Sequence, residues 1–220
     1  MTNGASHDAD HLEDITSSPP SWLNALKPVV LRRTGVALGL WGEAGIGKTF
    51  TAQTMLRELS CRSFSLHANA PLPEIARALP RPKKLPVWAE RNLERLECGE
   101  HVENQDAAST FAAVLIGLAP AVVYLEDLHE ADAERTELWK ALAEIALRSR
   151  GVGVFTTSRT EPPAPFRAVR LEPMSRAVSD ALLIAEAGSD IPREALGWIH
   201  ARAAGNPLFT LEFFRYLARM

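Results

Sequence analysis

The sequence predicts an α/β fold in which a five-stranded, mainly parallel sheet is flanked by helices and followed by a small helical subdomain. Short apolar runs alternate with segments of helical periodicity between residues 35 and 173, and this alternation is typical of a parallel sheet covered on both faces. From Ser175 onward the pattern is helical only. We therefore expect a core at residues 21–173 and a helical subdomain at residues 174–220.

Five runs are expected to form the strands. Each is short and mostly apolar, as buried parallel strands are. The expected strands cover residues 35–41, 62–68, 121–127, 152–159 and 168–173. The clearest of them is the run AVVYLED at 121–127, in which an apolar stretch leads directly into two acids.

Helical periodicity fills the remaining segments. Proline near the start and glycine at the end punctuate several of them, as Pro86 and Gly99 do. The expected helices cover residues 49–59, 86–99, 106–118, 132–151, 175–188, 192–205 and 207–220. The last of these has no stop signal before Met220, which indicates a domain that continues beyond the sequence given.

Composition narrows the class of protein. The chain has 220 residues, is 46% hydrophobic and has a net charge of -3, which gives no overall reason to expect nucleic acid or an anionic membrane as partner. Cys61 and Cys98 lack metal-ligand spacing and are expected to be free thiols. Without an apolar run long enough to span a bilayer or the pattern of a signal peptide, the chain is expected to be cytoplasmic.

Residues 1–20 are expected to form a disordered acidic tail, because they carry acids and few large apolar side chains.

A glycine-rich stretch between the first expected strand and helix carries the main chemical signal. Residues 42–49 read GEAGIGKT and fit the P-loop pattern in full. Its backbone N–H groups cradle phosphate, Lys48 reaches the β- and γ-phosphates, and the Thr49 hydroxyl suits Mg²⁺. The predicted nucleotide-binding residues of this stretch are Gly42, Glu43, Ala44, Gly45, Ile46, Gly47, Lys48, Thr49 and the adjoining Phe50.

The acids that end the third expected strand support this prediction. In P-loop enzymes a neighbouring strand presents an acid to the Mg²⁺ shell, often with a second acid that polarises water. Glu126 and Asp127 have this position, and with Thr49 they form the predicted Mg²⁺ set. The sequence has no Asn-Lys-x-Asp stretch for reading guanine. The residues therefore predict a domain that binds ATP or ADP with Mg²⁺.

Five motifs in order give a family resemblance. They are GEAGIGKT, VVYLEDLHEAD, VFTTSR, RLEPMS and GNPLF. In this combination the chain resembles the STAND class of AAA+-related ATPases, and within it the ATPase domains of large LuxR-type multidomain bacterial regulators. The resemblance covers residues 35–215, most of the chain.

The resemblance implies further roles. It makes Arg159 the residue that senses the γ-phosphate, so that the implied catalytic residues are Asp127, Glu126 and Arg159. It also implies that Gly205, Asn206 and Pro207 pack near the nucleotide base, which adds Pro207 to the nucleotide-binding set. Each role has a plainer alternative: a solvated loop arginine for Arg159, and a helix stop followed by a helix start for residues 205–207.

Three departures from the family pattern stand out. The family's pair of acids is usually two aspartates, whereas Glu126 stands first here. A Gly-Arg-Glu signature is missing upstream of the first strand, and Glu130 occupies the position of a frequent tryptophan. His129 beside it is expected to be a hydrogen-bonding residue rather than a catalytic one.

Three functions are weighed. A switch needs a γ-phosphate that is read by a movable segment, and residues 175–220 supply a candidate. A small phosphotransferase needs an acceptor motif, and a remodelling or loading ATPase of the AAA+ type needs an arginine supplied in trans; neither is identifiable. We therefore expect a slowly hydrolysing ATP switch of a signalling or transcriptional regulator. Its expected partners are nucleotide, further copies of itself with ATP, and protein partners or other domains, whereas nucleic acid would be bound only by domains outside these residues.

Overall fold

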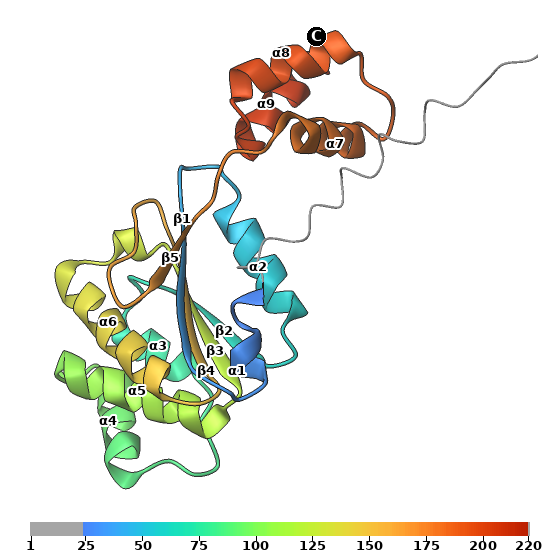
Figure 1. Cartoon of the computed structure of the whole chain (residues 1–220). Helices are drawn as coiled ribbons and strands as arrows, with labels where there is room; N and C mark the ends of the chain where they lie inside the picture. Colours follow the sequence, from blue (N-terminus) through green and yellow to red (C-terminus); the bar gives the residue numbers. More distant parts are fainter. Residues whose placement is uncertain (1–23, 220) are drawn as a thin grey trace, which may run out of the picture.

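The computed structural model describes residues 24–219 and consists of a five-stranded sheet with helices on both faces, followed by three helices beyond one end of the sheet (Figure 1). The strands are β1 (Val36–Trp41), β2 (Arg62–His67), β3 (Ala121–Glu126), β4 (Val152–Ser158) and β5 (Arg167–Arg170). The expected tail at residues 1–20 lies outside the described residues.

The strands lie in the order β2-β3-β4-β1-β5, and each neighbouring pair is parallel. The predicted five-stranded α/β sheet is thus confirmed. Because every strand runs the same way, the carboxyl ends of β1, β3 and β4 meet at one edge. β5 is shorter than the predicted run at 168–173, and beyond it the Leu171 N–H still donates to the Trp41 carbonyl at 2.8 Å.

The helices follow the predicted order with three additions. They are α1 (Lys27–Val30), α2 (Lys48–Glu58), α3 (Leu72–Ala78), α4 (Val87–Glu97), α5 (Asn104–Leu118), α6 (Ala133–Arg148), α7 (Arg176–Ala187), α8 (Arg193–Ala203) and α9 (Pro207–Leu217), with a 3₁₀ turn, η3, at Leu128–Glu130. The sequence did not predict α1, α3 or η3. These elements have four, seven and three residues, too few for a helical period to show.

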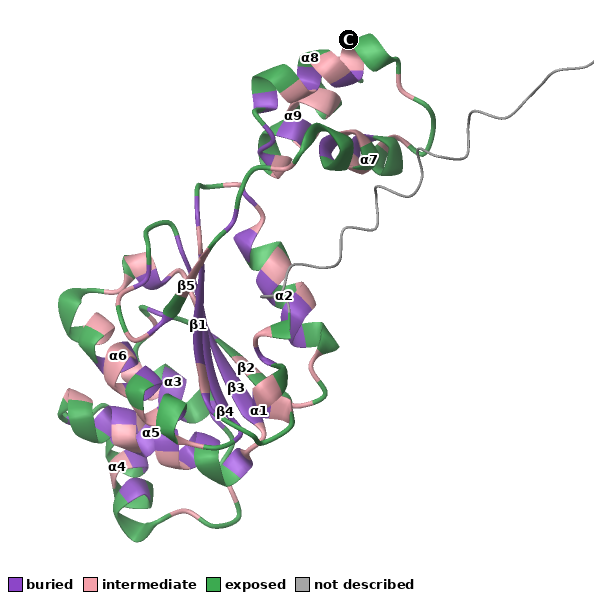
Figure 2. Ribbon diagram, viewed as in Figure 1, coloured by how far each residue is buried: buried purple, intermediate pink, exposed green. Residues whose placement is uncertain are grey.

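Two apolar layers hold the core together. Along β3, Val123 and Leu125 face the cluster under α3–α6, whereas Val122 and Tyr124 face the cluster under α1 and α2. This alternation follows from the two-residue period of a strand. Figure 2 shows the result as a buried sheet between two exposed outer surfaces.

The last three helices form a unit that we call the three-helix segment (residues 174–219). Its apolar centre consists of Leu183, Leu196 and Ile199, with partly buried side chains around them. As predicted, α7 begins after Ser175, whose hydroxyl accepts from the Val178 N–H at 3.4 Å, and it ends at Gly188 in the left-handed conformation. In the described part of the chain, no helix has the length and apolar character needed to cross a membrane.

Candidate nucleotide-binding site

The loop from Gly42 to Gly47 joins β1 to α2 at the carboxyl edge of the sheet. Gly45 and Gly47 have φ of +79° and +93°, a region that side chains other than glycine rarely adopt. Gly47 is also the N-cap of α2, and no side chain caps this helix start. The first N–H groups of α2 are therefore left for another acceptor, as in a helix end that binds phosphate.

Lys48 is buried at the first position of α2, with 8% of its surface exposed. Its amine donates to the carbonyl oxygens of Gly42 at 2.9 Å and Glu43 at 2.7 Å. Burial lowers the pKa of Lys48, the Asp127 charge opposes this shift and the Arg159 charge adds to it. An ammonium has three N–H donors, so one remains for an oxygen bound in the loop.

The two acids after the apolar run of β3 point in different directions. Glu126, the last residue of β3, follows Tyr124 by two positions and so lies on the α2 face of the sheet. Asp127 has left-handed φ and ψ of 53° and 55°, and its carboxylate lies 3.8 Å from the His129 imidazole. Both carboxylates nevertheless remain near Tyr124, because their charges add to burial in raising its pKa.

Side chains between β3 and β4 fix this edge of the sheet. The Thr157 hydroxyl accepts from the Asp127 N–H at 3.3 Å and shares a hydrogen bond of 3.1 Å with the Tyr124 hydroxyl. Burial raises the pKa of Tyr124 to about 12, which keeps its hydroxyl protonated. Neither residue was predicted from its position in the sequence. The signal that could have identified Thr157 is a hydroxyl side chain near the end of the strand that follows the two acids.

Arg159 follows directly after β4. Its backbone N–H donates to His129 Nδ1 at 3.4 Å, so the prediction of a hydrogen-bonding role for His129 is confirmed. The guanidinium belongs to the charges that act on the Lys48 amine. Lys48, Asp127 and Arg159, far apart in the sequence, are therefore brought into one electrostatic site.

The start of α9 rests on the phosphate loop. The Asn206 side-chain amide donates to the Ala44 carbonyl at 2.9 Å, and the Leu208 N–H lies 3.3 Å from the Gly45 carbonyl. The Asn206 side-chain oxygen also caps α9, since it accepts from the Leu208 and Phe209 N–H groups at 3.1 and 3.4 Å. One side chain therefore both starts the helix and holds it to the loop.

Other predicted residues differ in how close they come to this site. Thr49 is exposed at the start of α2, and the Pro207 ring comes within 3.9 Å of the position that a Cβ on Gly47 would take. Phe50 is 71% exposed and lines a surface groove with Gln53 and Arg57 of α2. The structure thus joins Pro207 to the loop but leaves Phe50 on the outside of α2.

The residues present fit a nucleotide with Mg²⁺. A Cβ on Gly45 would approach the Asn206 side-chain oxygen and the Leu208 Cβ to 2.8 Å, so the loop is shaped by closeness to α9 as well as by its own curl. The open helix start and the buried Lys48 amine suit phosphate, and the Thr49 hydroxyl and Glu126 carboxylate supply oxygen atoms of the kind that Mg²⁺ prefers.

A family model described as an AAA ATPase domain matches residues 23–155, more than half of the 220 residues. The match begins before β1 and ends within β4, so it contains the phosphate loop and both acids. No curated protein sequence matches this chain significantly.

Solved structures share the fold. A signal transduction ATPase with numerous domains (STAND) that carries a tetratricopeptide repeat sensor, from Pyrococcus horikoshii, superimposes with a TM-score of 0.56 at 16% identity over 86% of this chain. The RuvB Holliday junction branch migration motor of Thermotoga maritima gives 0.54 at 15% identity over 89% of this chain. The chain spans 30% of the first protein and 59% of the second. These similarities show that the chain shares the fold of these two proteins.

Proposed function

The chain belongs to the AAA ATPase domain family, and from this premise we propose that it is a slowly hydrolysing ATP switch module of a signalling or transcriptional regulator. In this proposal the core holds ATP or ADP with Mg²⁺. The three-helix segment, as a separate subdomain, takes different positions in the two nucleotide states. The two free thiols fit a reducing compartment such as the cytoplasm.

One observation carries the proposal: the three-helix segment is hydrogen-bonded to the phosphate loop itself. Asn206 and the Leu208 N–H donate to two consecutive carbonyls of that loop, those of Ala44 and Gly45. A nucleotide that alters the loop therefore acts directly on the start of α9. In a nucleotide switch, the bound nucleotide shifts the equilibrium between two positions of a movable element. The contact between α9 and the loop gives the nucleotide a route to such an element.

Arg159 is proposed to distinguish ATP from ADP. Its charge acts on the Lys48 amine, which supports a position near the end of the triphosphate. A charge-assisted hydrogen bond made only with ATP contributes about 1.5–3 kcal/mol, or roughly a ten- to hundredfold change in population. That is enough for a regulator, because a ligand shifts an equilibrium only by its difference in affinity for the two states.

The two acids are proposed to divide the remaining work. Glu126, on the same face as the start of α2, supports Mg²⁺ together with Thr49. Asp127, turned toward His129, polarises the attacking water. With bound nucleotide, Mg²⁺ would supply charge neutralisation at the phosphates, while the residues of this chain orient and hold it.

The nucleotide site is tested by calorimetric titration of Lys48→Ala with Mg-ATP and Mg-ADP. This change removes the buried cation of the loop and should weaken binding by several kcal/mol, more than the loss of one surface contact. Lys140→Ala is the matched control, because within residues 24–219 Lys140 pairs only with Glu137 on the surface of α6. Equal affinities in the Lys48 variant and the parent would contradict the site.

The switch is tested by hydrogen exchange across residues 174–219 with ADP and with a non-hydrolysable ATP analogue. Asn206→Asp keeps the acceptor that caps α9 but loses the donor to Ala44, whereas Asn206→Ala loses both. We expect the Asp variant to reduce the difference between the two nucleotides while α9 stays helical. Identical protection with both nucleotides in the parent would contradict a switch and favour a phosphotransferase or a remodelling ATPase.

A further inference from the structure

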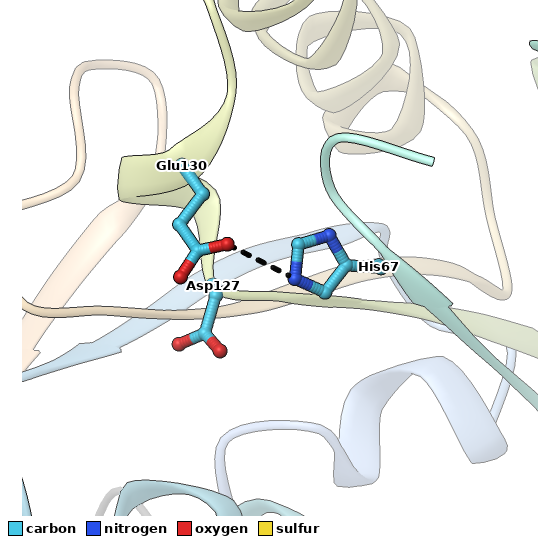
Figure 3. A group of neighbouring side chains, drawn as sticks. All are labelled: His67, Asp127 and Glu130. Carbon is cyan, nitrogen blue, oxygen red and sulfur yellow. Dashed lines mark ion pairs between the residues drawn. The ribbon is translucent and has the colours of Figure 1, made fainter. Parts of the chain in front are cut away.

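A second cluster of chemically active side chains lies beside the candidate catalytic acids, at the carboxyl ends of β2 and β3. It contains His67 from β2 and Asp127 and Glu130 from the residues after β3. One ligand atom from each lies within 4.8 Å of the others. Figure 3 shows the His67 imidazole facing the Glu130 carboxylate, with Asp127 next to them.

The spacing agrees with that of metal ligands. His67 Nε2 lies 3.4 Å from a Glu130 carboxylate oxygen. Two ligands of a tetrahedral Zn²⁺ with bonds of about 2.0–2.1 Å are separated by roughly 3.3 Å, so this pair has the required distance. His67 Nδ1 accepts from the Asn69 backbone N–H at 3.3 Å, so Nε2 of the neutral ring carries the proton. A metal ion on Nε2 moves this proton to Nδ1 and replaces the hydrogen bond from Asn69. The Asp127 carboxylate has to approach by about 1.5 Å at most to complete three ligands. Its side chain is 40% exposed, which leaves it free to turn.

A second histidine lies beside the two acids. His129 has its Nδ1 3.8 Å from Asp127 and its Nε2 4.0 Å from Glu130, and it is only 14% exposed. Because Nδ1 accepts from the Arg159 backbone N–H, the neutral ring carries its proton on Nε2, which faces Glu130. His129 Nδ1 is therefore engaged with the backbone, and His129 is not one of the three proposed ligands.

The ligand types select the class of metal. An imidazole with two carboxylates suits Zn²⁺ and similar borderline ions, whereas Mg²⁺ prefers oxygen ligands alone and keeps much of its water. We propose that His67, Asp127 and Glu130 form a binding site for a divalent transition-metal ion such as Zn²⁺, distinct from the Mg²⁺ site at Thr49 and Glu126. Occupancy of this site takes the Asp127 carboxylate away from the attacking water and so slows ATP hydrolysis, a consequence that rests on the proposed function.

Zn²⁺ binding to the nucleotide-free, tag-free full chain tests the site. Calorimetric titration in excess Mg²⁺ should show Zn²⁺ binding in the parent that His67→Ala and Glu130→Gln each weaken by roughly tenfold or more. His67 is 42% exposed, so its replacement leaves the core intact, and His67→Gln is a second variant that keeps a polar side chain there.

His101→Ala is the matched control. His101 and Glu103 form another exposed pair, with His101 Nε2 3.3 Å from the carboxylate, but these two residues are not in the three-ligand cluster. The His101 variant should keep the affinity of the parent. Equal Zn²⁺ affinity in the His67 variant and the parent, equal losses in the His67 and His101 variants, or full displacement of Zn²⁺ by Mg²⁺ would overturn the proposal.

Turnover is measured separately at saturating Mg-ATP with increasing Zn²⁺. The parent should lose activity over the same Zn²⁺ range that fills the site, and His67→Ala should need at least tenfold more Zn²⁺ for the same loss. Inhibition that is identical in both proteins would overturn the regulatory part. A chain that binds Zn²⁺ as expected but hydrolyses no ATP would contradict the proposed hydrolysis and leave the metal site supported.

Discussion

The core and the three-helix segment differ in how completely their buried polar groups are satisfied. In residues 24–173, the buried hydroxyls of Thr110, Thr156 and Thr157 all have hydrogen-bond partners. In the three-helix segment, four buried side-chain atoms have no partner within the described chain. These atoms belong to Ser179, Asp180, His200 and Thr210. An unsatisfied buried polar group costs about 1–3 kcal/mol of folding stability, so these atoms lower the stability of the segment relative to the core.

The apolar groups show the same difference. The segment has three fully buried apolar residues at its centre, whereas each face of the sheet covers a much larger cluster. Half of the large apolar side chains that lie exposed in residues 24–219 are on the segment. They are Val178, Ile184, Trp198, Leu208, Phe209 and Tyr216. Low local stability is what a part that moves requires, so the contrast fits a fixed core with a movable attachment.

The largest effect is expected from matched cavities in the two regions. Leu142 and Leu183 are both buried leucines on helices, one in the core and one in the segment. Leu142→Ala should lower the free energy of unfolding of the core by about 2–5 kcal/mol. Leu183→Ala should instead open the three-helix segment while β1, β3 and β4 stay protected in hydrogen exchange. Equal loss of strand protection in both variants would mean that the two regions unfold as one.

A smaller effect is expected where the two regions touch. Gly45→Ala adds a Cβ that meets Asn206 and Leu208 at 2.8 Å, at a φ of +79°. Gly188→Ala has a similar strain, at a φ of +64°, but meets nothing within 4 Å. The Gly188 variant should lose about 1 kcal/mol of unfolding free energy. The Gly45 variant should lose more and show faster hydrogen exchange at the start of α9. Similar losses of stability in the two variants would show that contact with α9 adds nothing.

Removing an unsatisfied hydroxyl should stabilise the segment. Thr210→Val keeps the shape of the side chain and removes an oxygen that has no partner, so we expect a gain of about 1 kcal/mol in local stability. Thr110→Val is the matched control, because this buried hydroxyl on α5 donates to the Asp106 carbonyl at 2.7 Å. The control should lose stability. Thermal unfolding of both variants measures whether the midpoint rises for Thr210→Val and falls for Thr110→Val. A lower midpoint for Thr210→Val would contradict the view that this hydroxyl is an unsatisfied group that destabilises the segment.

The smallest effect concerns a satisfied group of the core at high pH. Burial raises the pKa of Tyr124 from 10.0 to about 12, so the folded state keeps a proton that the unfolded state loses. The contribution of the protonated Tyr124 hydroxyl to the free energy of unfolding is therefore fully present below pH 10. It is lost as the pH rises toward 12. Tyr124→Phe should therefore cost about 0.5–1 kcal/mol at pH 8 and less near pH 11. Urea unfolding at both values measures this, and a cost that stays constant with pH would contradict it.

Much of the fold could be predicted because its signals are local. The alternation of apolar runs and helical periods fixed five strands and most helices, and the stretch around Lys48 indicated phosphate by itself. The short elements α1, α3 and η3 escaped prediction, since a helical period needs more residues than they contain. For the candidate site, the sequence named Lys48 and Arg159 but not the Thr157 hydroxyl, because its role depends on a partner from a neighbouring strand.

By itself, the sequence determined a parallel α/β core with a phosphate loop and a helical end, because glycine placement and periodicity are properties of neighbouring residues. Only the tertiary structure decided how Glu126 and Asp127 divide, with one on the α2 face and the other turned toward His129. It alone brought His67 to Glu130, and Asn206 to the Ala44 carbonyl. These contacts join residues that are distant in sequence, and no local pattern encodes them: their geometry follows from the order of the strands and the packing of α9 on the loop.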